Sequence, residues 1–188
     1  MRLIPTSLND AYLIDLDLIA DHRGFFARVF CADEFRRLDI ATQVVQINDA
    51  FSSGKGTLRG LHYQQPPSSE VKIVRCLHGA IWDVVVDLRP DSSTYSRWYG
   101  AELNADNRLM MYAPRGFAHG MLTLTDNSEV LYLVSDFYDP GRERGIRWND
   151  PHFAIAWPIS PTEISPKDAN WPDFDAGFHG VDGLRGLK

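Results

Sequence analysis

Short apolar runs separated by turn-forming residues dominate the chain. The clearest runs span residues 44–47, 71–77, 81–88 and 130–134, and they are rich in β-branched and aromatic side chains. Gly, Pro, Asn and Asp occupy the intervals, as they do between strands joined by turns. The even spacing, without an internal repeat, predicts an all-β fold: a double-sheet jelly roll or a related barrel, which can enclose a ligand cavity.

One segment shows helical periodicity instead. Asp33 is a residue type that caps helix N-termini, and Phe35 and Leu38 lie three positions apart on one helical face. We therefore expect a short helix that begins near Asp33, and few other helices in the fold.

The strand pattern weakens after about residue 150, where Pro, Trp and Asp become frequent. A length of 188 residues suits one domain with a substantial core. We expect residues 1–188 to form a single domain, in which residues 151–188 are a tail packed on the barrel.

Charge and composition narrow the class of protein. A formal net charge of −6 disfavours nucleic acid as a partner, because basic surfaces bind its phosphates. No apolar run approaches the roughly 18 residues of a membrane helix, and the first residues lack the features of a signal peptide. Cys31 and Cys76 lack CxxC spacing, so we expect free thiols rather than a disulfide framework or a zinc site. These features predict a cytoplasmic protein with no membrane partner.

Polar residues interrupt two of the predicted strands. Side chains alternate along a strand, so Lys72 and Arg75 point to opposite faces and one of them points into the barrel. An inward Lys72 requires an anion, whereas at a strand edge it would be solvated. Tyr132 shares the inward face with Val130 and Val134, either as a ligand-facing phenol or as a core tyrosine whose hydroxyl bonds to the backbone.

A histidine and an arginine lie together at residues 59–64, which read RGLHYQ. An imidazole titrates near neutral pH, so His62 can remove a proton from carbon if a cation holds the resulting charge; the alternative is a structural histidine. His119 follows a turn that contains Pro and Gly, where it can lie opposite His62. A cupin metal site needs His-x-His and an acidic ligand, but residue 64 is glutamine, so we expect no metal.

Two later turns carry further charged residues. Residues 142–151 combine three arginines with Glu143, which is typical of a solvated loop, although Glu143 can also reach a ligand. Asp168 ends the turn sequence Ser-Pro-Lys-Asp. A carboxylate there can orient His62 by accepting its second ring N–H, and spacing alone leaves that contact open.

Five segments, in the same order, resemble one family of nucleotide-sugar epimerases. They read DHRGFF at 21–26, GTLRGLHYQ at 56–64, VKIVRCLHGAIWDVVVDLR at 71–89, PRGFAHG at 114–120 and ERGIRWNDP at 143–151. Over nearly its whole length, the chain therefore resembles the cupin-like dTDP-4-dehydrorhamnose 3,5-epimerase family.

The resemblance implies a cofactor-free reaction, the 3,5-epimerisation of dTDP-4-dehydro-6-deoxy-D-glucose. It implies that His62 is the general base, Tyr132 the general acid on the opposite ring face, and Asp168 the partner of His62. A C4 ketone makes the C3 and C5 hydrogens acidic, because deprotonation places charge on O4. The resemblance puts Lys72 near that oxygen.

The resemblance also implies a set of residues around the nucleotide sugar, namely Arg23, Gln46, Asn48, Arg59, His119, Tyr138, Glu143 and Lys167. Tyr138 would stack on the base. Arginine forks bind phosphate oxygens in pairs, so Arg23 and Arg59 suit a diphosphate. The family is homodimeric with exchange of an N-terminal strand, so Arg23 would serve the neighbouring subunit.

One substrate-binding position departs from the family pattern. The family usually has a glutamate two residues after GFF, and this chain has Arg28 there. A carboxylate accepts a base N–H, which an arginine cannot do. The alternatives left open are C3-only epimerisation, epimerisation of another nucleotide-linked 4-keto sugar and, further from the family, a non-catalytic sugar-nucleotide binder.

Overall fold

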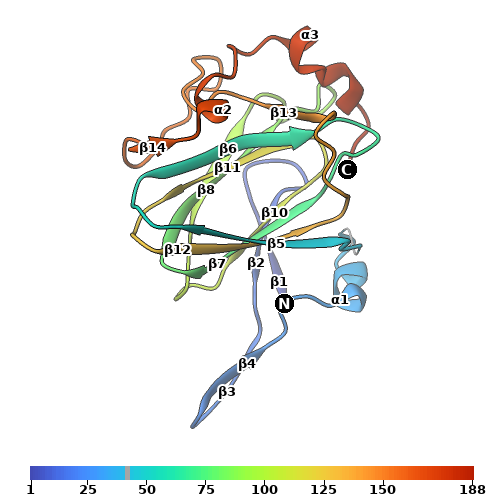
Figure 1. Cartoon of the computed structure of the whole chain (residues 1–188). Helices are drawn as coiled ribbons and strands as arrows, with labels where there is room; N and C mark the ends of the chain where they lie inside the picture. The colour runs from blue at the N-terminus through green and yellow to red at the C-terminus, as the bar shows by residue number, and fades with distance from the viewer. Residues whose placement is uncertain (41–42) are drawn as a thin grey trace.

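Two β-sheets face each other and form the body of the protein, as the computed structural model shows for residues 1–40 and 43–188 (Figure 1). The first sheet has the order β1 (Arg2–Pro5), β2 (Tyr12–Asp15), β10 (Met110–Ala113), β7 (Lys72–His78), β12 (Ser128–Val134), β5 (Gln46–Ser52). The second has the order β13 (Glu143–Gly145), β6 (Thr57–Gln64), β11 (Phe117–Thr123), β8 (Ala80–Asp87), β9 (Trp98–Asn104), with β14 (Glu163–Ile164) paired to β6. The predicted all-β double-sheet fold is confirmed.

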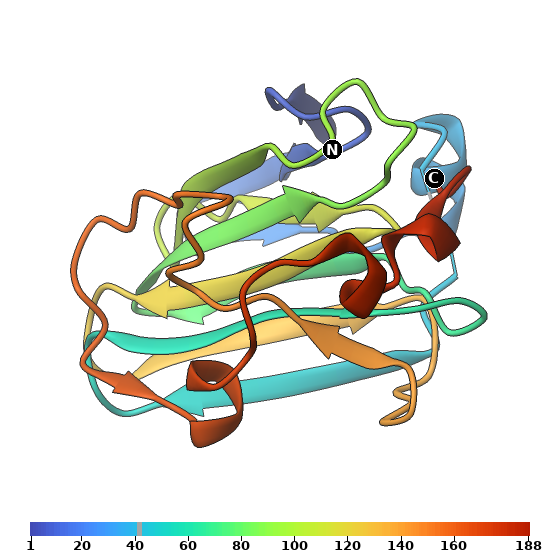
Figure 2. The same cartoon turned by 90° about the horizontal axis from the view of Figure 1, so that it is seen from above.

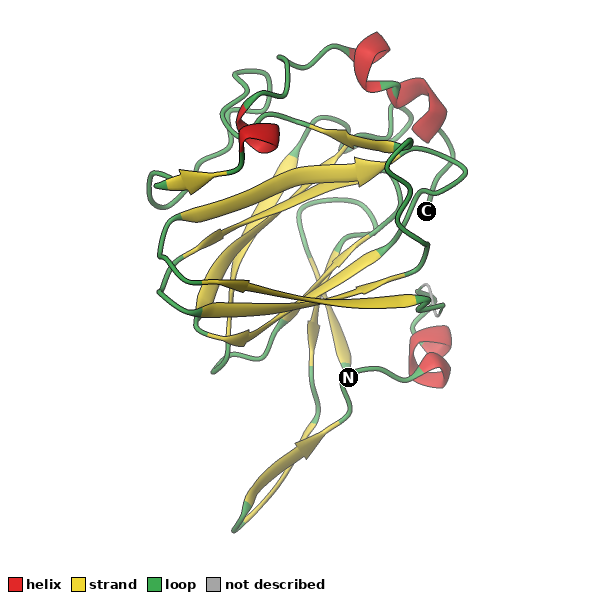
Figure 3. Ribbon diagram, viewed as in Figure 1, coloured by secondary structure: helices red, strands yellow, loops and turns green. Residues whose placement is uncertain are grey.

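Helices are short and lie outside the sheets (Figure 3). They are α1 (Ala32–Arg37), α2 (Pro166–Ala169), α3 (Ala176–His179) and the 3₁₀ helix η1 (Val181–Leu184). In the part of the chain that the structure describes, no helix is long and apolar enough to cross a membrane. Strands β3 (Leu18–Asp21) and β4 (Gly24–Ala27) form a hairpin that projects away from the two sheets (Figure 1).

The helix near Asp33 begins earlier than predicted. Cys31 is the N-cap, without a side-chain capping bond, and Asp33 lies inside the first turn. There the positive end of the helix dipole stabilises its negative charge, and its carboxylate pairs with the Arg36 guanidinium at 3.2 Å. The prediction that Asp33 is the cap is therefore wrong. Phe35, on the face that it was expected to share with Leu38, is fully buried.

Three predicted strands match β7, β8 and β12 within two residues, but the first does not match β5. Residues 44–47 were expected to form a strand, whereas β5 begins at Gln46 and continues to Ser52. The apolar pattern does not continue along β5, because Gln46, Asn48 and Ala50 line the cavity rather than the apolar core. Apolar content identifies strands that face a core, so it misses a strand whose inner face contacts solvent or ligand.

Alternating side chains of both sheets meet in the barrel interior. Val74 and Cys76 of β7 pack there with Val85 of β8 and Met121 of β11. The face of β7 that carries Lys72 is therefore the inward one, which the sequence had left open between Lys72 and Arg75.

The C-terminal segment lies across the outer face of the second sheet (Figure 2). Val181 and Leu184 of η1 are buried with Leu61, whose side chain points outward from β6. The hydroxyl of Tyr63 donates to the carbonyl of His179 at 2.7 Å. The tail thus contacts the back of the strand that carries His62.

Candidate active site

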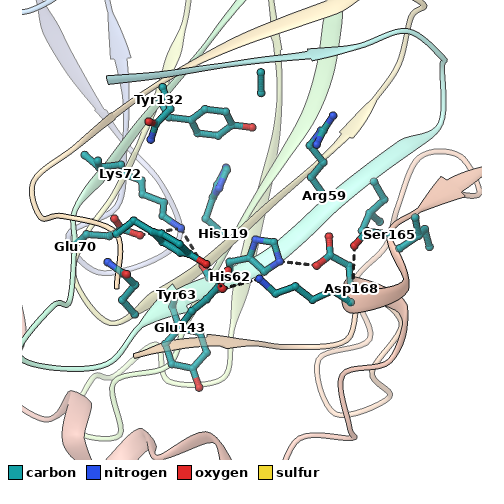
Figure 4. Close-up of a pocket in the computed structure, with 18 of the residues that line it drawn as sticks. Arg59, His62, Tyr63, Glu70, Lys72, His119, Tyr132, Glu143, Ser165 and Asp168 are labelled. Carbon is teal, nitrogen blue, oxygen red and sulfur yellow. Dashed lines mark hydrogen bonds and ion pairs between the residues drawn. The ribbon is translucent and has the colours of Figure 1, made fainter. Parts of the chain in front are cut away.

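A cavity of about 700 Å³ opens between the two sheets (Figure 4). Its volume lies in the usual range for a small-molecule site. Most of the site residues expected from the sequence line it, namely Gln46, Asn48, Arg59, His62, Lys72, His119, Tyr132, Tyr138, Glu143, Lys167 and Asp168. The structure brings them together from both sheets and from α2.

Arg23 and Arg28 are not brought to this cavity within the same chain. Arg23 lies at the tip of the β3–β4 hairpin, where its guanidinium pairs with Asp21 at 2.6 Å. Arg28 follows the hairpin and pairs with Glu34 of α1 at 2.7 Å.

His62 and Asp168 form a hydrogen-bonded pair. His62 lies on β6 and its Nε2 is 2.6 Å from Asp168 Oδ1, although the two residues are 106 positions apart in sequence. Ser165 caps α2 by accepting the N–H of Asp168, which fixes the carboxylate at the first turn. With Nε2 bound to the carboxylate, Nδ1 of His62 is the nitrogen that can take a proton from a ligand.

The Asp168 carboxylate is stabilised in its charged form. Burial alone would raise its pKa, but the hydrogen bonds from His62 and from the Gly60 N–H at 3.1 Å outweigh that effect and lower the pKa. Gly60 has φ +121°, and a Cβ there would lie 2.5 Å from Gly120 Cα on β11. Glycine is needed at this close approach of the two strands, which also presents the Gly60 N–H to Asp168.

Lys72 points into the cavity, which resolves the alternatives for its side chain. Its ammonium lies 3.1 Å from Glu70 Oε1 and 3.3 Å from the carbonyl oxygen of His62. The Lys72 side chain is 16% exposed, so its charge is partly desolvated and interacts more strongly with other charges than it would in water.

Tyr132 faces His62 from the other sheet. Tyr132 lies on β12 of the first sheet and His62 on β6 of the second, so their side chains approach the cavity from opposite sides (Figure 4). The Tyr132 ring packs edge-on against His119, with 5.9 Å between ring centroids. Burial raises the pKa of Tyr132 well above its ordinary value, so the phenol holds its proton at neutral pH.

A charged cluster lies on another part of the cavity wall. Glu143 accepts from the Lys167 ammonium at 2.6 Å and from the Tyr138 hydroxyl at 2.8 Å. Burial tends to raise the pKa of Glu143, but these two bonds lower it overall. The Arg59 guanidinium is held by the Phe51 carbonyl at 3.0 Å.

Two acidic residues near the site were missed from the sequence. Glu70 contacts Lys72, and Asp83 of β8 is 2.7 Å from His119 Nε2. Asp83 had a detectable signal, because it occupies the inward register between Ile81 and Val85 in a strand that is otherwise apolar up to Asp87 at its end. Glu70 lies in the turn before β7, where no periodicity marks it.

The two facing sheets, with a His–Asp pair, a tyrosine and a lysine around one cavity, define a cupin-like jelly-roll protein with an acid–base site. The chain belongs to the dTDP-4-dehydrorhamnose 3,5-epimerase family, which matches residues 5–176.

Named relatives are similar over most of their length. The dTDP-4-dehydrorhamnose 3,5-epimerase of Escherichia coli K12 is 42% identical over 170 residues, which cover 89% of this chain and 91% of that protein. The Legionella pneumophila epimerase, solved with dTDP-4-keto-L-rhamnose, has a TM-score of 0.89 at 35% identity, covering 98% and 97% of the two chains. A 3′-monoepimerase from Streptomyces bikiniensis, solved with dTDP-quinovose, has a TM-score of 0.86 at 34% identity, covering 96% and 91%.

Proposed function

We propose that the protein epimerises dTDP-4-dehydro-6-deoxy-D-glucose at C3 and C5, giving dTDP-4-dehydro-L-rhamnose without a cofactor. The observation that carries this proposal is the position of His62 and Tyr132 on facing sheets of one cavity, with Asp168 of α2 bound to His62. Inversion at a carbon next to a ketone needs a base on one ring face and an acid on the other.

His62 removes the proton next to the C4 ketone through Nδ1, while Asp168 holds its Nε2–H and stabilises the imidazolium that forms. The negative charge moves to O4, where the Lys72 ammonium offsets it. Tyr132 then delivers a proton from the opposite face. Each proton-transfer group contributes about 10²–10⁴-fold and a charge-stabilising donor about 10²–10³-fold.

The charged wall of the cavity suits a nucleoside diphosphate. Arg59 and Lys167 are cations that bind phosphate oxygens, and the exposed ring of Tyr138 offers a surface on which a base can stack. Gln46 and Asn48 of β5 add amide donors and acceptors for sugar or base. His119 and Glu143 complete the proposed set of substrate contacts.

The active form in this proposal is a homodimer in which Arg23 enters the neighbouring subunit's cavity. The β3–β4 hairpin projects from its own barrel and exposes Ile19 and Phe26, which are 68% and 64% exposed and directly paired across the strands. Apolar pairs of this kind usually lie at protein interfaces. Arg28, at the base of the same hairpin, belongs to the proposed contact region.

A cytoplasmic location is also proposed. Cys31 and Cys76 are both free thiols, as is usual in a reducing compartment.

The proposal is tested by incubating the protein with the dTDP-, UDP-, CDP- and GDP-linked 4-keto-6-deoxy sugars and following the sugar configuration by NMR. We expect epimerisation of the dTDP sugar and much slower reaction of the others. Binding of a sugar nucleotide without turnover of any of the four would contradict an enzyme and favour the non-catalytic binder.

C3-only epimerisation is the second candidate, because the structural neighbour from Streptomyces bikiniensis is a 3′-monoepimerase. Turnover in D₂O separates the two reactions. Double epimerisation places deuterium at both C3 and C5, whereas deuterium at C3 alone would establish the narrower reaction.

A further inference from the structure

A second His–Asp pair adjoins the cavity beside the first. His119 Nε2 is 2.7 Å from Asp83 Oδ2, nearly the same separation as the 2.6 Å between His62 and Asp168. His119 and His62 are directly paired across β11 and β6. Because Nε2 of His119 contacts Asp83, Nδ1 is the ring nitrogen that remains available to contact a ligand in the cavity.

The two carboxyl groups have opposite environments. Asp168 Oδ2 accepts the Gly60 N–H, so both of its oxygens are hydrogen-bonded. Asp83 is 0% exposed, and within residues 1–40 and 43–188 its Oδ1 has no hydrogen-bond donor. Burying an ionised carboxylate that has one oxygen without a hydrogen bond costs much free energy. Burying a neutral carboxyl group in the same environment costs less.

The charged and titratable groups around Asp83 come from three strands. They are His119 on β11, Lys72 and Cys76 on β7, and Tyr132 on β12. Lys72 favours the charged carboxylate, but Glu70 lies 3.1 Å from its ammonium and offsets that influence. Complete burial outweighs the attraction of His119 and Lys72 and raises the pKa of Asp83.

We propose that the pairs hold different numbers of protons: one in His62–Asp168 and two in His119–Asp83. Asp83 is the neutral partner, and its O–H donates to His119 Nε2. The neutral imidazole of His119 then carries its hydrogen on Nδ1 and donates it to a substrate oxygen in the cavity. This inference rests on the proposed function, in which the substrate oxygen O4 gains negative charge when His62 removes the proton.

One pair therefore accepts a proton from carbon, and its neighbour donates a hydrogen bond to oxygen. When two titratable groups lie in environments that give them different protonation states, one can act as the base and the other as the acid. Asp83 is a positioning residue, because it acts only by fixing the tautomer of His119.

The same substitution at the two carboxyl groups separates their roles. In Asp83→Asn the amide N–H replaces the carboxyl O–H, so kcat falls by no more than about tenfold, the cost of a changed hydrogen bond. In Asp168→Asn the charge that supports the base is lost, and kcat falls by about 10²–10⁴-fold. Asp83→Leu leaves the His119 tautomer unset, and we expect a loss of about 10²–10³-fold with little change in KM.

A spectroscopic measurement on the ligand-free protein decides the proton count without turnover. Infrared difference spectra between wild type and Asp83→Asn should show the carbonyl stretch of a protonated carboxylic acid, lost in the variant. In ¹⁵N-histidine NMR, His119 should be protonated on Nδ1 only. Absence of the acid band, an imidazolium at His119, or equal kcat losses in the two folded asparagine variants would overturn the proposal.

Discussion

In the proposed mechanism, Asp168 sets how strongly His62 acts as a base. Its carboxylate holds the Nε2–H and remains charged, because the Gly60 N–H and the His62 ring stabilise the ionised form. This contact leaves Nδ1 of the imidazole for the ligand, and the imidazolium of the proposed reaction would be stabilised by a buried negative charge.

Replacing His62 by alanine should abolish proton abstraction and leave binding intact. We expect turnover to fall by about 10²–10⁴-fold, because the base is lost, whereas dTDP still binds the cations of the cavity wall. Steady-state kinetics and titration calorimetry measure the two effects. His78→Ala, at the far end of β7, is the matched control and should keep wild-type turnover. Wild-type turnover in His62→Ala would remove the assigned base.

The lowered pKa of Asp168 makes one part of the stability depend on pH. The ordinary pKa is 3.8 and the folded value lies below it. The carboxylate therefore stabilises the fold fully above 3.8, and this contribution is lost as the pH falls through the folded pKa. Urea unfolding of wild type and Asp168→Asn should show a difference in free energy that narrows below 3.8. A difference independent of pH would contradict the assigned ion pair.

At the scale of elements, sequence patterns predicted the strands with apolar inner faces and misjudged the extent of β5, whose inner face is largely polar. β7 and β12 were found because short runs of β-branched and aromatic residues mark them. The alternation of side chains placed Tyr132 on the inner face and left Lys72 or Arg75 as the inward cation of β7.

Contacts between distant turns were also beyond the sequence patterns. α2 has four residues, too few for a helical period, and the bond from its Asp168 to His62 spans 106 positions. The family resemblance supplied that pair. Asp83 was missed because neither the resemblance nor a turn drew attention to it, although a charged residue in an apolar strand marks an unusual core position.

The β3–β4 hairpin should be the element that holds two subunits together. Changing Ile19 and Phe26 to serine together removes an exposed apolar pair, and we expect the protein to become monomeric by light scattering coupled to size-exclusion chromatography. Phe178→Ser is the matched control, because Phe178 is 55% exposed on the opposite, C-terminal part of the chain. An unchanged dimer in the hairpin variant would refute this role.

At the scale of the whole molecule, the proposed site is built from two subunits. Arg23 lies far from the cavity of its own barrel, at the tip of the projecting hairpin (Figure 1). The proposed symmetric dimer would place each hairpin against the partner, so each cavity would combine one subunit's His62 with the other subunit's Arg23.

Mixing two inactive variants tests this shared site. His62→Ala and Arg23→Ala subunits, unfolded and refolded together, should regain about a quarter of wild-type activity, because half of the dimers are mixed and each has one complete cavity. Each variant refolded alone should stay far below that level. No recovery in a mixture shown to contain mixed dimers would place Arg23 outside the partner's cavity.

The central claim is that His62 and Tyr132 act on opposite faces of one sugar ring, and deuterium exchange by Tyr132→Phe tests it most directly. In D₂O, wild type should incorporate deuterium with inversion, and His62→Ala should do neither. Tyr132→Phe keeps the base and lacks the acid, so NMR should show deuterium entering the sugar while the carbons keep their configuration. Inversion at the wild-type rate in Tyr132→Phe, or exchange in His62→Ala, would contradict the account.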